Sequence, residues 1–230
     1  MDGVATNVKI LSVRAVPDGD ERDKDVAMAF RYAVDNGAKV INTSFGKAYS
    51  PDKEWVYEAL QYAAENDVLI VNAAGNDSNN IDEVYTYPND SKDLVTEFTN
   101  NVITIGAMSA NWDENLPASF SNYGKLNVDV FAPGVAIYAT FPDERYQAIS
   151  GTSMAAPSTA GVAALIRSYY PELSAAQVKG ILMNSGTQVN LEVKLPGTED
   201  LVPFKDLSVS GRIVNAYNAL KMADQMVNGK

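Results

Sequence analysis

Seven consecutive residues at positions 151–157, Gly-Thr-Ser-Met-Ala-Ala-Pro, contain the side chains of this sequence that are best placed to do chemistry. They precede residues 158–170, whose apolar side chains recur at i, i+3, i+4 and i+7, the spacing of one face of a helix. The other positions are mostly Ala and Gly, so this helix is expected to be buried. Free N–H groups and the dipole at a helix N-terminus favour negative charge, and they would stabilise an alkoxide or oxyanion beside Ser153.

A structural interpretation of the same hydroxyl groups is an ordinary helix cap. Ser and Thr are common at the N-cap, and the helical pattern alone would assign Thr152 or Ser153 to that role. Pro157 adds a feature that a cap does not need. It has no N–H group with which to bond the carbonyl of Ser153, four residues earlier. The backbone at Ser153 is therefore free to adopt a special geometry.

Alternating strands and helices are predicted to position this segment. The predicted strands are residues 9–16, 39–44, 67–72, 101–107 and 128–131, and the predicted helices in this region are residues 25–36 and 51–66. The continuous apolar run at 68–71 is typical of a parallel strand covered on both faces. The alternation predicts an α/β fold, with a doubly wound, mostly parallel sheet and helices on both faces.

The remaining segments complete this pattern without a visible domain boundary or internal repeat. The polar, acidic stretch at 77–100 is expected to be a surface excursion. Residues 136–149 are expected to form a hairpin that leads to Ser153. A capping box at 174–177 begins a short helix, residues 188–210 are expected to be an extended tail, and residues 215–227 a final helix.

Charge and composition exclude several classes of protein. The net charge of −11 repels phosphate backbones, so we expect no nucleic-acid partner. The absence of cysteine excludes disulfides and cysteine-bound zinc. No apolar run is long enough for a membrane span. No cofactor is expected from the residues.

The seven-residue segment resembles the nucleophile motif of the subtilisin-like serine proteases, and the resemblance extends over essentially the whole chain. In that family the serine of the motif attacks the scissile carbonyl, a role that the resemblance assigns to Ser153. It also implies a three-layer subtilisin-like fold, a protein or peptide substrate, and a secreted or cell-envelope location, although the sequence itself leaves the location open. Family members often bind calcium, but no ligand loop can be assigned in this sequence.

Two further segments resemble the family in type and in order, and each follows a predicted strand. In open α/β sheets, sites lie beyond the carboxyl ends of the strands. The resemblance implies that the first segment pairs with the substrate backbone and that the second walls the pocket for the residue before the scissile bond. The residues are Ser44, Phe45 and Gly46 in the first segment, and Ala73, Ala74 and Gly75 in the second. Asn76 would be the oxyanion donor, and Thr86, in Thr-Tyr-Pro, would lie at the pocket floor.

The sequence departs from the family pattern because it contains no histidine. A serine nucleophile usually needs a general base, most often histidine, and the family's triad runs Asp, His, Ser in chain order. The resemblance places the acid and the base upstream of residue 1. Residues 1–230 are thus expected to be a partial catalytic domain whose N-terminal strands are missing, and this chain alone is predicted to be inactive.

Other functions remain open at this point. A non-catalytic member of the family could bind peptides or act as a scaffold, and an esterase could use a different base. Ser153, Asn76 and the pocket segments favour the peptidase, since a protein without catalysis does not need them.

The predicted sheet has a gap. In the family, the strand that bears the catalytic acid lies between the strands that match residues 9–16 and 39–44. A gap in a buried sheet leaves backbone groups unpaired and apolar edges exposed. We therefore expect either that residues 9–16 pair directly with 40–44 or that a second copy fills or covers the gap, and in both cases a tendency of the chain to self-associate.

Overall fold

The computed structural model describes residues 3–16 and 19–229, and its centre is a mostly parallel sheet. The strand order is β1-β2-β3-β4-β10-β7. The strands are β1 (Val40–Thr43), β2 (Leu69–Ala73), β3 (Val102–Met108), β4 (Val130–Pro133), β7 (Thr187–Gln188) and β10 (Arg212–Ile213). All neighbouring strands pair in parallel except β10 and β7, which are antiparallel. The predicted α/β fold is confirmed.

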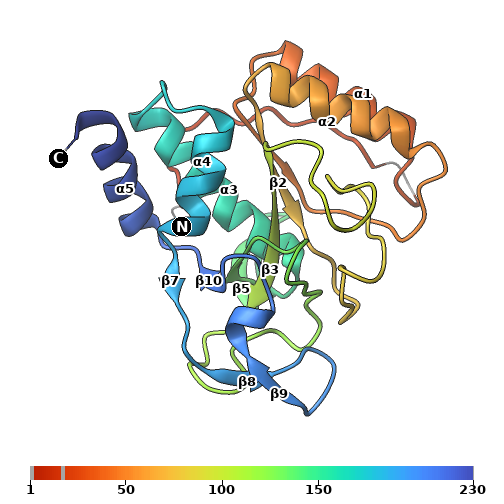
Figure 1. The fold of residues 1–230 in the computed structure, drawn as a ribbon. Helices are drawn as coiled ribbons and strands as arrows, with labels where there is room; N and C mark the ends of the chain where they lie inside the picture. Colours follow the sequence, from red (N-terminus) through yellow and green to blue (C-terminus); the bar gives the residue numbers. More distant parts are fainter. Residues whose placement is uncertain (1–2, 17–18, 230) are drawn as a thin grey trace.

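Helices cover both faces of this sheet (Figure 1). They are α1 (Asp23–Asp35) and α2 (Lys53–Glu65) on one face, and α3 (Thr152–Tyr169), α4 (Ala175–Asn184) and α5 (Ala216–Asn228) on the other. β2 shows why both layers form. Leu69 and Val71 pack into the apolar cluster with α3, whereas Ile70, whose side chain points to the opposite face, packs with α1 and α2.

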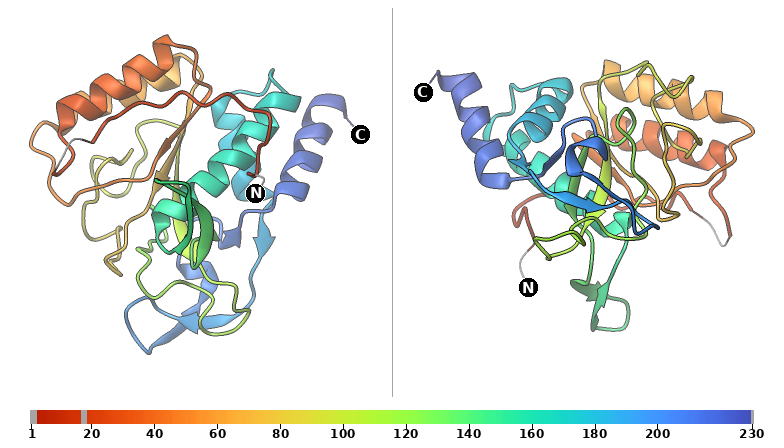
Figure 2. Two further views of the ribbon diagram at one scale, coloured as in Figure 1. Left: turned by 180° about the vertical axis from the view of Figure 1, so that it is seen from behind. Right: turned by 60° about the horizontal axis from the view of Figure 1, so that its bottom comes forward.

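The smaller elements lie near the predicted positions. The hairpin β5 (Ile137–Phe141) and β6 (Arg145–Ile149) projects from the body of the molecule (Figure 2). The capping box at Ser174 and Gln177 is present at the start of α4. The predicted extended tail contains a second hairpin, β8 (Glu192–Lys194) and β9 (Leu201–Pro203), followed by the 3₁₀ helix η1 (Phe204–Asp206).

The predicted strand at residues 9–16 was wrong. No strand or helix forms within residues 3–16, and Ile10 is 89% exposed. An isolated strand cannot satisfy its backbone N–H and C=O groups except with water, so it needs a neighbouring strand. Within the described residues β1 pairs with β2 alone, which leaves its other edge open. The expected direct pairing of residues 9–16 with β1 is therefore also absent.

The acidic stretch at 77–100 is not only a surface excursion. Asp90 and Ser91 are buried, and so are Tyr87 and Pro88. The acidic composition was a poor guide because two of its carboxylates, Asp90 and Glu97, have the buried Lys179 as a partner.

Candidate active site

Ser153 lies in the first turn of α3, where two reciprocal hydrogen bonds join it to the segment after β1. Its Oγ donates to the carbonyl of Ser44 at 3.1 Å, and the Ser44 Oγ donates to the carbonyl of Ser153 at 2.8 Å. The second bond fills the place that Pro157 leaves empty in the helical ladder. The N-cap residue of α3 is Gly151, without a side-chain cap, so the hydroxyls of Thr152 and Ser153 are not ordinary caps.

Asn76 is held beside Ser153 by the neighbouring residue, Thr152. The Asn76 Oδ1 accepts hydrogen bonds from the backbone N–H of Thr152 at 2.8 Å and from its Oγ1 at 3.0 Å. The hydroxyl of Thr152, fully buried, in turn accepts from the N–H of Gly75 at 3.1 Å. Because its oxygen is engaged, the Asn76 amide has a fixed orientation with its NH₂ group available. Sequence reasoning assigned Thr152 no such role, although it belongs to the same motif.

The turn that carries Asn76 depends on Gly75 and Asn122. Gly75 has φ 104°, and a Cβ there would lie 2.3 Å from the Asn122 Nδ2. The Asn122 amide donates to the carbonyl of Ala74 at 2.8 Å and accepts from the N–H groups of Asp77 and Asn79. Asn122 was missed in the sequence because its contacts lie more than 40 residues away along the chain.

The structure brings the predicted pocket floor against the predicted substrate segment. Lys47 and Tyr87 exchange two backbone hydrogen bonds, at 2.9 and 2.8 Å. A Cβ on Gly46 would lie 3.1 Å from the Tyr87 carbonyl and 3.7 Å from the Thr86 side chain. Thr86 therefore lies next to Gly46, as a shared pocket requires.

The residues predicted to bind the substrate separate into different environments. Ala74 and Thr86 line one cavity, together with Asn72, Asn89, Asp90 and Thr104. Phe45 lines a second cavity with Val26, Val56 and Tyr87. Ala73 lines neither, because its side chain packs into the core cluster that contains α3. The first cavity contains a residue that sequence reasoning missed, the buried Asp90.

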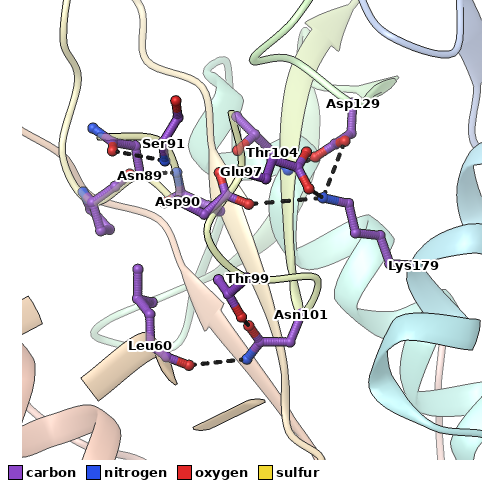
Figure 3. A network of polar contacts seen from close by, with 12 residues as sticks. Leu60, Asn89, Asp90, Ser91, Glu97, Thr99, Asn101, Thr104, Asp129 and Lys179 are labelled. Carbon is purple, nitrogen blue, oxygen red and sulfur yellow. Dashed lines mark hydrogen bonds and ion pairs between the residues drawn. The ribbon is translucent and has the colours of Figure 1, made fainter. Parts of the chain in front are cut away.

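Asp90 belongs to a buried charged cluster around Lys179 of α4 (Figure 3). The Lys179 Nζ lies 2.8 Å from Glu97 Oε2, 3.5 Å from Asp129 Oδ1 and 3.8 Å from Asp90 Oδ2. Burial raises the pKa of Asp90 to about 7 and that of Asp129 to about 6, although the ammonium of Lys179 acts in the opposite direction. Burial alone would lower the pKa of Lys179, but the three carboxylates outweigh it and the pKa lies above its usual value.

Within residues 3–16 and 19–229, no group of three or more His, Cys, Asp or Glu side chains is arranged to hold a metal ion. The same part of the chain contains no helix of the length and apolarity that a membrane crossing needs.

Comparison with known proteins identifies the family of this chain. The sequence model of the subtilase family, Peptidase_S8, matches residues 1–206. Subtilisin DY from Bacillus licheniformis is 34% identical over 189 residues, covering 81% of this chain and 64% of that protein. Thermitase from Thermoactinomyces vulgaris is 35% identical over 189 residues, covering 82% of this chain and 61% of that protein. The crystal structure of a cold adapted subtilisin-like serine proteinase has a TM-score of 0.71 at 30% identity, covering 90% of this chain and 68% of that chain.

The chain thus spans slightly less than two thirds of the length of these two relatives. The family match covers most of the chain, and it includes the residues that carry Ser153 and Asn76. This chain belongs to the subtilase family of serine proteases.

Proposed function

We propose that this chain carries the nucleophile and the oxyanion donor of a subtilisin-like serine endopeptidase, which hydrolyses peptide bonds through an acyl-enzyme on Ser153. The observation that supports this most directly is the Asn76 amide, which Thr152 holds beside Ser153 with its NH₂ group available. A fixed N–H donor near the nucleophile stabilises the charge that develops on a carbonyl oxygen during acyl transfer.

In the proposed reaction the Ser153 Oγ bonds to the scissile carbonyl carbon while its proton passes to a base. The carbonyl oxygen becomes an oxyanion near Asn76. The C–N bond then breaks, the amine leaves with the proton from the base, and water releases the acyl group as a carboxylate. The substrate is a protein or peptide whose backbone lies along residues 44–46, where Gly46 allows a close approach.

The base is the missing component of this reaction. Ser153 Oγ donates to the carbonyl of Ser44, which cannot take up the proton, and the chain has no histidine. We propose that the base and its acid lie in the part of the family's length that this chain does not span, and that the chain alone is inactive.

A non-catalytic role in peptide binding or scaffolding is the second candidate, and the same absence of histidine favours it. The gene sequence upstream of codon 1 distinguishes the two. A segment of the His-Gly-Thr-His type in that reading frame supports the endopeptidase, whereas its absence supports the binding protein.

Ser153 of the chain alone is expected to resist a fluorophosphonate reagent, because its hydroxyl has no base to activate it. In subtilisin itself, removal of the histidine lowers turnover by about 10⁶-fold. Intact-mass spectrometry after exposure to the reagent measures the labelling, and Ser153→Ala is the control. Rapid stoichiometric labelling that Ser153→Ala abolishes would show that this chain holds a base of its own.

For the location we propose secretion or attachment to the cell envelope. The support is a relative named a cell wall-associated protease, from Bacillus subtilis, which is 36% identical over 202 residues and covers 87% of this chain. Fractionation of the source cells, followed by immunodetection of the chain, tests this location.

A further inference from the structure

Lys179 is a buried lysine for which the proposed reaction has no use. Its side chain is 8% exposed, and it extends from α4 to the carboxylates of Asp90, Glu97 and Asp129 (Figure 3). One ammonium group thus faces three carboxylates, and the cluster has an excess of negative charge whenever all three are ionised.

Two of these carboxylates depend on Lys179 to neutralise their buried negative charge. The Asp90 Oδ2 and the Asp129 Oδ1 are buried and accept no hydrogen bond. A buried charge without a partner is costly. Across the part of the chain that the structure describes, no other cationic side chain lies within ion-pair distance of Asp90, Glu97 or Asp129.

The cluster joins a loop to the sheet. Asp129 precedes β4 directly, and its Oδ2 accepts a hydrogen bond from the N–H of Thr104 in β3 at 2.7 Å. Asp90 and Glu97 belong instead to the irregular chain between β2 and β3. They are neighbours across a short internal ladder, in which Ser91 pairs with Glu97 and the N–H of Phe98 donates to the Asp90 carbonyl at 2.8 Å. Lys179 therefore attaches this loop to β4 and α4.

The same loop carries Thr86, the predicted floor of the substrate pocket. Thr86, Asn89 and Asp90 all line the cavity that Ala74 also lines. The Asn89 amide donates to the carbonyl of Thr86 at 2.8 Å, so these two residues move as a unit. A displacement of Asp90 would pass to both of them through the intervening backbone.

We infer that Lys179 is a positioning residue for the substrate pocket: its charge holds Asp90 and Glu97 against α4, and so sets Asn89 and Thr86 at the base of the pocket. The role of this pocket in substrate binding rests on the proposed endopeptidase function, whereas the attachment of the loop to α4 does not. Because burial raises the pKa of Asp90 to about 7 and that of Asp129 to about 6, these two carboxylates lose charge below neutral pH. The loop should depend most on Lys179 at pH 8, where Asp90 and Asp129 are both ionised.

Hydrogen exchange of the full chain tests this inference at pH 5.5 and pH 8.0, with rates corrected for intrinsic exchange. In Lys179→Met at pH 8.0, amides in 87–98 should exchange at least about tenfold faster than in the unchanged chain. Lys179→Arg keeps the charge and should remain within about threefold of the unchanged chain. Lys194→Met removes another lysine that pairs with two carboxylates, Glu114 and Glu199, and should leave these amides unaffected.

A binding assay connects the loop to the pocket. The probe is a fluorescein-labelled tetrapeptide that ends in phenylalanine with a free carboxylate. Lys179→Met should weaken its affinity at least about tenfold at pH 8.0, and Lys179→Arg should restore it. The double variant Asp90→Asn/Asp129→Asn, which resembles the two protonated carboxyl groups, should remove the difference in loop exchange between pH 5.5 and pH 8.0.

Unchanged exchange and affinity in a folded Lys179→Met variant would overturn the inference. If that variant fails to fold, the double variant Asp90→Asn/Asp129→Asn decides, since a pH response that persists in it excludes the charged cluster as the cause. If the folded, unchanged chain does not bind the tetrapeptide at all, the proposed function fails at this site, while the exchange data still decide whether Lys179 holds the loop.

Discussion

At the scale of single residues, Thr152 connects the proposed nucleophile to the proposed oxyanion donor. It is fully buried, and its hydroxyl is used twice, as a donor to Asn76 Oδ1 and as an acceptor from the N–H of Gly75. A side chain of the same shape without the hydroxyl would lose both bonds. The position of Asn76 thus depends on a residue that does not itself react.

Thr152→Val is therefore expected to lower the free energy of unfolding by about 1–3 kcal/mol, because the N–H of Gly75 and the Asn76 oxygen each lose a partner. Urea unfolding followed by circular dichroism measures the change. Thr152→Ser keeps the hydroxyl and serves as the control. Equal stability of Thr152→Val and Thr152→Ser would show that the two hydrogen bonds do not contribute.

At the scale of elements, Asp23 ties the start of α1 to the segment after β1. Its carboxylate accepts hydrogen bonds from the Ser50 Oγ at 2.6 Å and the N–H of Asp52 at 2.9 Å, and it lies 2.7 Å from the Lys47 Nζ. Its position in the first turn of α1 also suits a negative charge. Because Lys47 directly follows the predicted substrate segment, α1 supports that segment from the side.

Asp23→Asn is expected to destabilise the chain by about 3–5 kcal/mol at pH 7, since Lys47 then keeps a nearly buried charge without its partner. Thermal unfolding as a function of pH measures this. The control is Glu58→Gln, which breaks an exposed ion pair between α2 and Arg31 and should cost less than about 1 kcal/mol. A cost for Asp23→Asn no larger than that of Glu58→Gln would contradict this role.

The pH dependence has a definite sign. Burial acts to raise the pKa of Asp23, but the hydrogen bonds from Lys47, Ser50 and Asp52 outweigh it, so the pKa in the folded chain lies below its usual range. A lowered pKa means that the stabilisation is complete above the unfolded value and is lost as the pH falls through the folded one. The difference between Asp23→Asn and the unchanged chain should therefore shrink below about pH 4.

At the scale of the whole molecule, the sheet ends at an open strand. β1 pairs only with β2 in the described part of the chain, and residues 3–16 form no strand beside it. Val4, Val8, Ile10 and Leu11 leave 40–89% of their surface exposed. Open edges and exposed apolar side chains together favour pairing with another chain.

We therefore expect the chain to self-associate, and Ile10→Lys to weaken that association by about tenfold, because it places a charge among the exposed apolar side chains. Light scattering coupled to size-exclusion chromatography, over a range of concentrations, measures it. Val95→Lys changes a residue that is 68% exposed in the loop between β2 and β3, and it is the control. A chain that stays monomeric at every concentration would contradict this expectation.

The sequence by itself determined the features that depend on neighbours along the chain. The helices followed from the periodicity of their apolar side chains. The parallel strands followed from apolar runs such as residues 68–71, because a strand that is covered on both faces has apolar side chains on both. The motif around Ser153 and the segment that ends at Asn76 were also visible, because each is contiguous. Pro157 correctly indicated that the Ser153 carbonyl lacks its helical partner, since a missing N–H is a property of the residue alone, but the backbone at Ser153 itself is helical and Ser44 Oγ donates to that carbonyl.

Only the tertiary structure decided the features that depend on distant partners. A strand at residues 9–16 is compatible with its sequence, but a strand forms only beside another, and β1 remains unpaired on that edge. The acidic loop reaches the interior at Asp90, and the positive charge beside its buried carboxylate comes from Lys179, more than 80 residues away along the chain. Thr152 likewise forms a hydrogen bond to Asn76, which lies 76 residues earlier in the chain, and so holds it beside Ser153. Hydrogen bonds and ion pairs of this kind act at a few ångströms, and only the fold brings such residues that close.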